Sequence, residues 1–169
     1  MHPRAAELIH LLDLEPHPEG GYYRRIHRSE SRVLREADGI GRRALTSIYY
    51  LLTEGSLSRW HRVCADEAWH HYEGAPLELL VFEADGSLTL SHRLGPLLEG
   101  DTPAYVVPAG WWQAARPLGA YSLVGCTVGP GFEFADFTLL ADLPEEERPA
   151  SPSFADFELF LPCPNCSLY

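Results

Sequence analysis

The chain has 169 residues, a net charge of −11, 46% apolar residues and 22% charged residues, an ordinary composition for one globular domain. This acidic balance argues against nucleic acid as a partner, because binding to phosphate backbones depends on clustered positive charge. All basic residues other than histidine are arginine, so chemistry that needs a lysine Schiff base or a lysine general base is excluded.

The first predicted element is one short helix. Apolar side chains in residues 5–14 recur with the spacing of a single helix face, and Pro16 and Pro18 end the pattern. Charges at Glu7 and Asp13 interrupt the apolar stretch, and no apolar run in the chain approaches the roughly 18 residues of a membrane helix. We therefore expect a cytoplasmic protein with neither an export signal nor a membrane partner.

After the helix, the pattern changes to short strands separated by Gly, Pro and Asp turns. Ala84-Asp85-Gly86-Ser87, for example, joins two alternating segments as a hairpin turn would. About ten strands at this spacing predict an all-β sandwich or barrel. The expected strands are Tyr22–His27, Leu45–Leu52, Ser58–Arg62, Glu67–Tyr72, Leu77–Glu83, Leu88–Leu94, Ala104–Val107, Trp112–Ala115, Tyr121–Val128 and Phe134–Leu140.

The last part of the chain has a different character. Residues 144–153 are rich in Glu, Pro and Ser and predict a solvated connector, so we divide the chain into a barrel domain over 1–143 and a C-terminal extension over 144–169. In the extension, Cys163-Pro-Asn-Cys166 has the spacing of metal ligands, but no second pair completes a four-ligand zinc site. We interpret Cys64 and Cys126 as structural thiols, because no His/Asn partner pattern marks a nucleophile.

Two motifs carry the chemistry. The first places Gly55, His61, Val63, Glu67 and Gly74 at intervals that match the first cupin motif, except that valine stands where that motif has its second histidine. The second is Pro108-Ala-Gly-Trp-Trp-Gln113, which resembles the Pro-x-Gly-x-x-His of the second cupin motif with glutamine in place of histidine. Two of the four metal ligands that the resemblance implies are therefore unchanged.

Further segments in order resemble a family of small uncharacterised bacterial and fungal cupins over roughly residues 5 to 143. They are Pro16–Arg24, Thr46–Leu52, His61-Arg62, Asp66–Trp69, Ser122–Val128 and Gly129–Phe132. The resemblance implies a cupin jelly-roll β-barrel with a short N-terminal helix, paired as a homodimer. It also implies a shape similar to seed-storage proteins and to dTDP-sugar 3,5-epimerases, and much less about activity.

One interpretation of the motif residues is a weakly bound divalent metal ion. His61 and Glu67 could be joined by Gln113 through its amide oxygen, a neutral ligand, and imidazole plus carboxylate suits zinc, iron, nickel or manganese. His70 and His71 could compensate for the missing ligands. Strand alternation places Trp69 and His71 on the face of Glu67, and a bulge would reverse that choice. Replacing two imidazoles by valine and an amide predicts low affinity.

A second interpretation uses acid–base catalysis without metal. The resemblance to the epimerases implies a histidine base and a tyrosine acid, here His61 with Tyr49, or with Tyr50 or Tyr72 as alternatives. Glu19 and Arg24 beside two glycines are expected to close one end of the pocket, and Trp69, His71, Trp112 and Gln113 to contact the ligand. A purely structural alternative is that His61 and Glu67 only form hydrogen bonds inside the barrel. An uncompensated carboxylate inside a barrel, however, costs several kcal/mol of stability. Such groups are usually retained for function.

We therefore expect a cupin-type protein that binds a small polar or sugar-like molecule in the barrel and carries out isomerase- or epimerase-type proton transfer. Two alternatives stay open at this point: a metal-dependent cupin enzyme, and a module that binds or stores a ligand without turning it over. The identity of the ligand does not follow from the residues.

Overall fold

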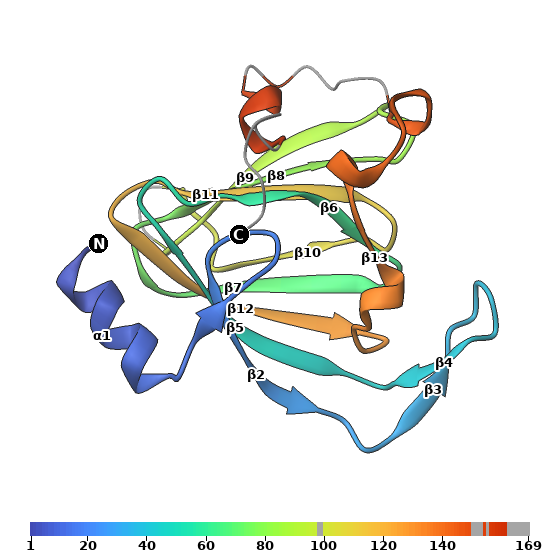
Figure 1. Ribbon diagram of the computed structural model, residues 1–169, viewed down its shortest axis with the longest axis horizontal. Coiled ribbons are helices and arrows are strands. Elements are labelled where there is room, and N and C mark those ends of the chain that lie inside the picture. The colour runs from blue at the N-terminus through green and yellow to red at the C-terminus, as the bar shows by residue number, and fades with distance from the viewer. Residues whose placement is uncertain (98–99, 150–153, 155, 162–169) are drawn as a thin grey trace.

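The computed structural model describes residues 1–97, 100–149, 154 and 156–161 (Figure 1). Its elements are α1 (Pro3–Leu11), β1 (Glu15–Pro16), β2 (Tyr22–Arg28), β3 (Arg32–Leu34), β4 (Gly41–Arg43), β5 (Thr46–Thr53), β6 (Ser58–Val63), β7 (Asp66–Gly74), β8 (Leu77–Phe82), β9 (Thr89–Leu94), β10 (Ala104–Val107), β11 (Trp112–Pro117), β12 (Tyr121–Gly129), η1 (Phe134–Asp136), β13 (Phe137–Leu139), η2 (Leu140–Asp142), η3 (Glu145–Glu147) and η4 (Phe157–Phe160). Cys163 and Cys166, with the zinc hypothesis that concerns them, lie outside the described residues.

The helix α1 is shifted toward the N-terminus relative to the prediction. The side chain of His2 accepts a hydrogen bond from the backbone N–H of Arg4, and Pro3 occupies the first turn, where its missing N–H has no cost. The helix ends at Leu11, because Asp13 takes a positive φ of 51° and turns the chain toward β1. None of the helices in the described part of the chain combines the length and the apolar character needed to span a bilayer.

The strands form two main antiparallel sheets, in agreement with the predicted all-β fold. One sheet has the order β1-β2-β5-β12-β7-β10, the other has the order β13-β6-β11-β8-β9, and β3 and β4 form a separate hairpin that the sequence reasoning did not predict. The strand expected over Phe134–Leu140 is shorter than predicted. Its first half forms the η1 turn, and only Phe137–Leu139 pairs with β6.

Strand alternation sorts the apolar side chains into three layers. The barrel interior holds one cluster that includes Tyr50, Trp69, Leu79 and Val124. A second cluster lies on the outer face of the β6–β11–β8 sheet, where Trp60, Phe82 and Trp112 are covered by Phe157 and Phe160 of η4. The third lies between α1 and the outer face of β5 and β12. Because both faces of the central strands are covered, β8 and β12 are apolar almost throughout.

The segment between β12 and β13 is fastened from outside the barrel. Asp136 in η1 accepts two hydrogen bonds from the guanidinium of Arg42 in β4, at 2.6 and 2.8 Å, and lies 2.9 Å from that of Arg35 after β3. Asp136 and Arg35 are both buried. A buried charge is tolerated when it is paired in this way, so the β3–β4 hairpin and the η1 segment are held together by charge.

Candidate functional site

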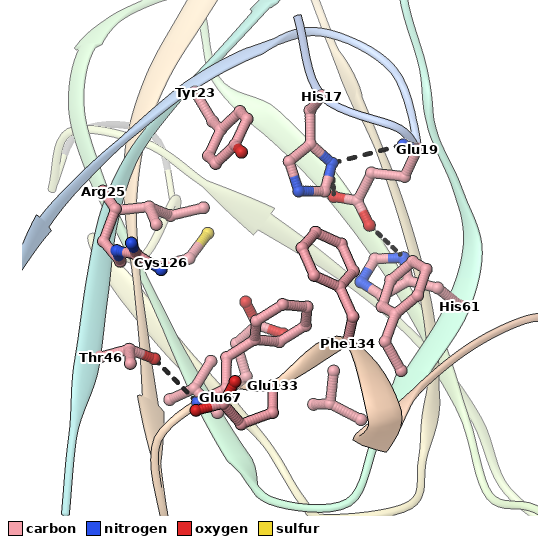
Figure 2. A pocket seen from close by; sticks show the side chains of 15 residues that line it. His17, Glu19, Tyr23, Arg25, Thr46, His61, Glu67, Cys126, Glu133 and Phe134 are labelled. Carbon is pink, nitrogen blue, oxygen red and sulfur yellow. Dashed lines mark hydrogen bonds and ion pairs between the residues drawn. The ribbon is translucent and has the colours of Figure 1, made fainter. Parts of the chain in front are cut away.

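A pocket of about 100 Å³ opens at one end of the barrel, between the two sheets (Figure 2). Its polar lining comes from five strands, from the chain before β2 and from the chain after β12. Its apolar lining comes from Ile48, two valines and three phenylalanines. A cavity of this order holds a small organic molecule. The lining residues are His17, Glu19, Tyr23, Arg25, Thr46, Ile48, His61, Val63, Glu67, Cys126, Val128, Phe132, Glu133, Phe134 and Phe137.

The chain before β2 reaches into the barrel because two consecutive glycines can adopt the positive φ angles and the close backbone contact that this path requires. Gly20 and Gly21 have φ values of +116° and +71°, and a Cβ at Gly20 would collide with the carbonyl oxygen of Leu57. The hydroxyl of Tyr50 donates a hydrogen bond to the carbonyl of Gly20 at 2.7 Å and fixes the loop. His17 and Glu19 consequently face the pocket rather than solvent (Figure 2).

Glu19 and His61 form a buried pair. Nδ1 of His61 lies 3.0 Å from the Glu19 carboxylate and 2.7 Å from the backbone carbonyl of Arg59. Both partners are acceptors only, so the Nδ1 of His61 carries a proton. The hydroxyl of Ser58 donates to the second carboxylate oxygen of Glu19 at 3.0 Å. Nε2 of His61 is left directed toward the middle of the pocket (Figure 2).

The pair is ionised at neutral pH. Burial acts to lower the pKa of His61, but the negative charge of Glu19 and the hydrogen bond to it outweigh burial and raise the pKa to about 9. Burial acts to raise the pKa of Glu19, but the charge and hydrogen bond of His61 outweigh it and lower the pKa to about 2. His61 is therefore an imidazolium whose Nε2–H can be donated to a ligand.

Glu67 is held in a different electrostatic state. Its carboxylate accepts a hydrogen bond from the amide nitrogen of Gln113 at 2.6 Å, and the amide oxygen of Gln113 accepts one from the indole N–H of Trp69 at 2.9 Å. Burial raises the pKa of Glu67 to about 7, against the lowering effects of His61, of the Gln113 amide and of the Cys126 thiol. Glu67 therefore exchanges a proton close to neutral pH.

These residues do not fit a divalent metal ion, which corrects the predicted ligand set of His61, Glu67 and Gln113. The indole N–H of Trp69 is a donor only, so it fixes the oxygen of Gln113 toward the tryptophan and turns the amide nitrogen toward Glu67. Val63 cannot coordinate. Within the described residues no group of three or more His, Cys, Asp or Glu side chains is placed to hold a metal.

Removal of divalent ions should barely change the stability of the protein. We expect EDTA to shift the melting temperature by less than about 3 °C, because a ligand that is mostly dissociated adds little to the folded state. Thermal melts with and without EDTA, together with elemental analysis of protein purified without chelator, measure this. A fall of about 10 °C in the melting temperature on addition of EDTA, together with one metal ion per chain, would contradict the conclusion that these residues do not fit a metal.

Two further predicted site residues lie outside the pocket. Tyr49, predicted as the catalytic acid, packs in the cluster under α1 and edge-on against Tyr72, on the face of the sheet opposite Tyr50. Arg24, predicted to close the pocket, pairs with Asp13 on the surface. In β2 it is Tyr23 and Arg25 that line the pocket. Alternation along a strand explains both corrections, because neighbouring residues point to opposite faces.

The predicted ligand contacts on the other strands are also elsewhere. Trp69 and Gln113 lie behind Glu67 and position it, as described above. His71 has the inward phase of β7 but lies about 13 Å along the strand from Glu67, with Nε2 at 3.1 Å from the carbonyl of Ala75. Trp112 belongs to the outer cluster and carries the guanidinium of Arg62 over its ring. Of the predicted set, Glu19, His61 and Glu67 line the pocket.

Several lining residues were not predicted as part of the site. Arg25, Tyr23 and Cys126 fall on predicted strands, and alternation would have supplied them once the inward face was known. His17 lies in the Pro16–Arg24 segment that resembles the family, but nothing in the sequence distinguishes it from a turn residue. Phe132, Phe134 and Phe137 form the apolar wall and gave no chemical signal.

The geometry agrees with a comparison of the sequence with known families. A model described as "Cupin superfamily (DUF985)" matches residues 6–140, which is most of the chain. The chain belongs to this cupin family. The predicted cupin jelly-roll barrel is thereby confirmed, and the described part of the C-terminal extension covers the outer sheet of the cupin barrel.

Solved structures agree with this assignment. The cupin is 37% identical to a hypothetical protein from Leishmania major, with 79% of this chain and 85% of that chain covered and a TM-score of 0.74. It is also 37% identical to a protein from Shewanella oneidensis, with 80% and 83% covered and a TM-score of 0.71. An oxalate decarboxylase variant from Bacillus subtilis, at 16% identity, 80% and 33% coverage and a TM-score of 0.56, shares the fold. Nothing among curated proteins matches the chain.

Proposed function

We propose that this cupin binds a small polar or sugar-like molecule in the barrel pocket and isomerises it by acid–base proton transfer. The observation that carries the proposal is the arrangement of His61, whose Nδ1 proton is held by Glu19 and Arg59, so that its Nε2–H faces the same pocket as Glu67. The pair is charged while Glu67 titrates near neutral pH. An acid and a base therefore face one cavity.

The two groups take distinct roles. Glu67, as carboxylate, removes a proton from a carbon next to a carbonyl, and the electrons of that C–H bond form a carbon–carbon double bond. His61 donates its Nε2 proton to the carbonyl oxygen, which gives an enol or enediol. Reversal with the proton returned to another position or face completes the isomerisation. Histidine is thus the acid and glutamate the base, whereas the sequence predicted a histidine base and a tyrosine acid.

Deuterium incorporation tests the proposal without knowledge of the natural ligand. The protein is incubated in D₂O with hydroxyacetone, dihydroxyacetone, glyceraldehyde or pyruvate, and loss of the C–H signals is followed by proton NMR. We expect exchange that Glu67→Gln and His61→Gln each lower by about 100-fold. His10→Gln, on the exposed face of α1, is the matched control and should leave the rate unchanged. Exchange that persists in both pocket variants would contradict the proposal. Binding without exchange would favour the non-catalytic module.

The rate of exchange should depend on pH in a bell shape. It should rise as Glu67 loses its proton near pH 7 and fall as His61 loses its proton near pH 9, because the base must be free and the acid charged. Initial exchange rates between pH 5 and 10 measure both limbs. A rate that keeps rising above pH 9 would exclude His61 as the acid.

We also propose that the cupin is a homodimer paired through its N-terminal strands. β1 pairs with β2 only at Tyr22 and Tyr23, so residues 24–28 of β2 have β5 on one side and no described strand on the other. Ile26, in that stretch, is 45% exposed, and an open edge with an apolar side chain invites a second copy. Light scattering should give twice the 18.9 kDa of one chain, and a single-chain mass would refute the pairing.

A further inference from the structure

His17 presents a hydrogen-bond donor to the pocket. Its Nδ1 accepts a hydrogen bond from the backbone N–H of Glu19 at 3.3 Å, and a backbone N–H can only donate. In the neutral ring the proton is therefore on Nε2. Burial lowers the pKa of His17 despite the nearby Glu19 carboxylate, so the neutral ring is the form present at pH 7. Edge-on contacts with Tyr23 and Tyr50 hold the ring in place.

The donors of His17 and His61 converge. Figure 2 shows Nε2 of each ring directed toward the middle of the pocket, away from the Nδ1 contacts with Glu19. Neither Nε2 has a hydrogen-bond partner among the described residues, and neither is sealed from the cavity. Two imidazole N–H groups thus face the same space, one neutral and one positively charged.

A cation stands at the same pocket. Arg25 lines it from β2 and has no carboxylate within 4.0 Å among the described residues, in contrast to Arg28, which pairs with Glu133 at 2.6 Å. The carboxylates of the pocket already have partners. Glu19 is hydrogen-bonded to Ser58 and paired with His61, and Glu67 accepts from Gln113. The pocket therefore has unused donors, whereas each of its carboxylates already has a partner.

We propose that the ligand of this pocket is a small carboxylate, which accepts a hydrogen bond from Nε2 of His17 while Arg25 supplies opposite charge. Its neighbouring carbonyl oxygen accepts from Nε2 of His61. This inference rests on the proposed function, because it places the ligand in the same pocket and names its chemical class. A guanidinium beside an imidazole N–H suits a carboxylate, because hydrogen bonds that involve a charged partner are the stronger ones. The phenylalanine wall and a volume of about 100 Å³ suit the short carbon chain of a three- or four-carbon acid.

A monoanion is favoured over a phosphate dianion. Three carboxyl groups, Glu19, Glu67 and Glu133, already line the pocket. Glu19 is paired with His61 and Glu133 with Arg28, whereas Glu67 has no cationic partner within 4.0 Å among the described residues. A second full negative charge on the ligand would face Glu67 without a further cation. A single negative charge on the ligand is matched by Arg25, so Glu67 can still lose its proton near neutral pH and act as the base.

The test compares pyruvate, its neutral analogue pyruvamide and inorganic phosphate on the full-length protein by calorimetry, with NMR of the imidazole N–H groups. We expect pyruvate to bind at least about tenfold more tightly than pyruvamide, the size of one charge-assisted hydrogen bond. His17→Phe keeps the aromatic packing and removes the donor, so it should weaken pyruvate about tenfold and leave pyruvamide unchanged. His10→Phe, at an exposed position of α1, is the matched control.

Equal affinities for pyruvate and pyruvamide, tighter binding of phosphate, or no detectable pyruvate binding at about 10 mM would each overturn the inference. The comparison of ligands on the unaltered protein decides the matter even if His17→Phe fails to fold. Carboxylate binding without deuterium exchange would reject the proposed catalysis and keep this site. Deuterium exchange of neutral ketones without a preference for carboxylate ligands would support the proposed catalysis and reject the carboxylate site.

Discussion

Glu19→Gln should destabilise the cupin by about 3 kcal/mol at pH 6, because it removes the buried charge that compensates the imidazolium of His61. The amide of glutamine can still accept the Nδ1 proton, so the loss comes from the charge rather than from the contact. His61 would answer by releasing its proton. Its pKa should fall below the ordinary value of 6.5, since burial would then act with little opposition.

The effect of Glu19→Gln should depend on pH in a definite direction. The raised pKa of His61 contributes stability that is fully present below about 6.5 and is lost as the pH rises through about 9. The lowered pKa of Glu19 contributes stability that is present above about 4.5 and is lost as the pH falls through about 2. The difference between the two proteins should therefore be largest near pH 6 and should shrink toward pH 9 and above.

Urea unfolding at pH 6 and pH 9.5 and an NMR titration of the His61 ring measure these quantities. Glu54→Gln, on an exposed turn, is the matched control and should change stability by no more than about 0.5 kcal/mol. Equal destabilisation at the two pH values would show that the pair is not ionised in the folded protein, and the acid role of His61 would then be lost.

Phe160→Ala should cost about 4 kcal/mol, the largest effect that we expect from one substitution. Phe160 is 0% exposed and packs with Trp60 and Phe157 on the outer face of the β6–β11–β8 sheet. The indole N–H of Trp60 donates to the carbonyl of Phe157 at 3.1 Å, which ties the extension to the barrel. Removal of the ring leaves a cavity between two elements far apart in the sequence.

For a chain of this length the loss corresponds to a fall in melting temperature of about 10 °C. Leu159→Ala, at a side chain that is 54% exposed, is the control one residue away and should have little effect. A Phe160→Ala protein with unchanged melting temperature would mean that the extension is not part of the folded unit. It would also restore the division at residue 143 that the sequence suggested.

Much of this fold could be predicted from the sequence, because alternation and turn residues report local structure. Most of the main strands lie within a residue or two of their predicted ends. The β3–β4 hairpin escaped because residues 32–43 are mostly polar or exposed, so no alternation marks them. The packing of residues 154–161 on Trp60 escaped because it is a long-range contact that no local pattern encodes. The dimer and the cytoplasmic location stay predictions.

The site was predictable at the level of spacing but not of orientation. His61 and Glu67 were found because motif spacing places both on inward positions of two consecutive strands, β6 and β7, which belong to opposite sheets. Which atom of Gln113 faces Glu67 depends on Trp69, a residue from another strand, and no spacing reports that. The choice between Arg24 and Arg25 depended on which face of β2 lines the pocket. One such shift by a single residue moves a side chain from the pocket to the surface.

The ion pairs of Asp136 with Arg35 and Arg42 let the shape of the pocket change independently of its reacting groups. The acid and base stand on barrel strands, whereas two phenylalanines of the apolar wall flank η1, which Arg35 and Arg42 hold from a hairpin outside the barrel. A change in the length or charge of that hairpin would reset the size of molecule admitted without touching a reacting group. Redesign of this cupin for larger ligands therefore begins at residues 31–44, in a surface arm that contributes no atom to catalysis.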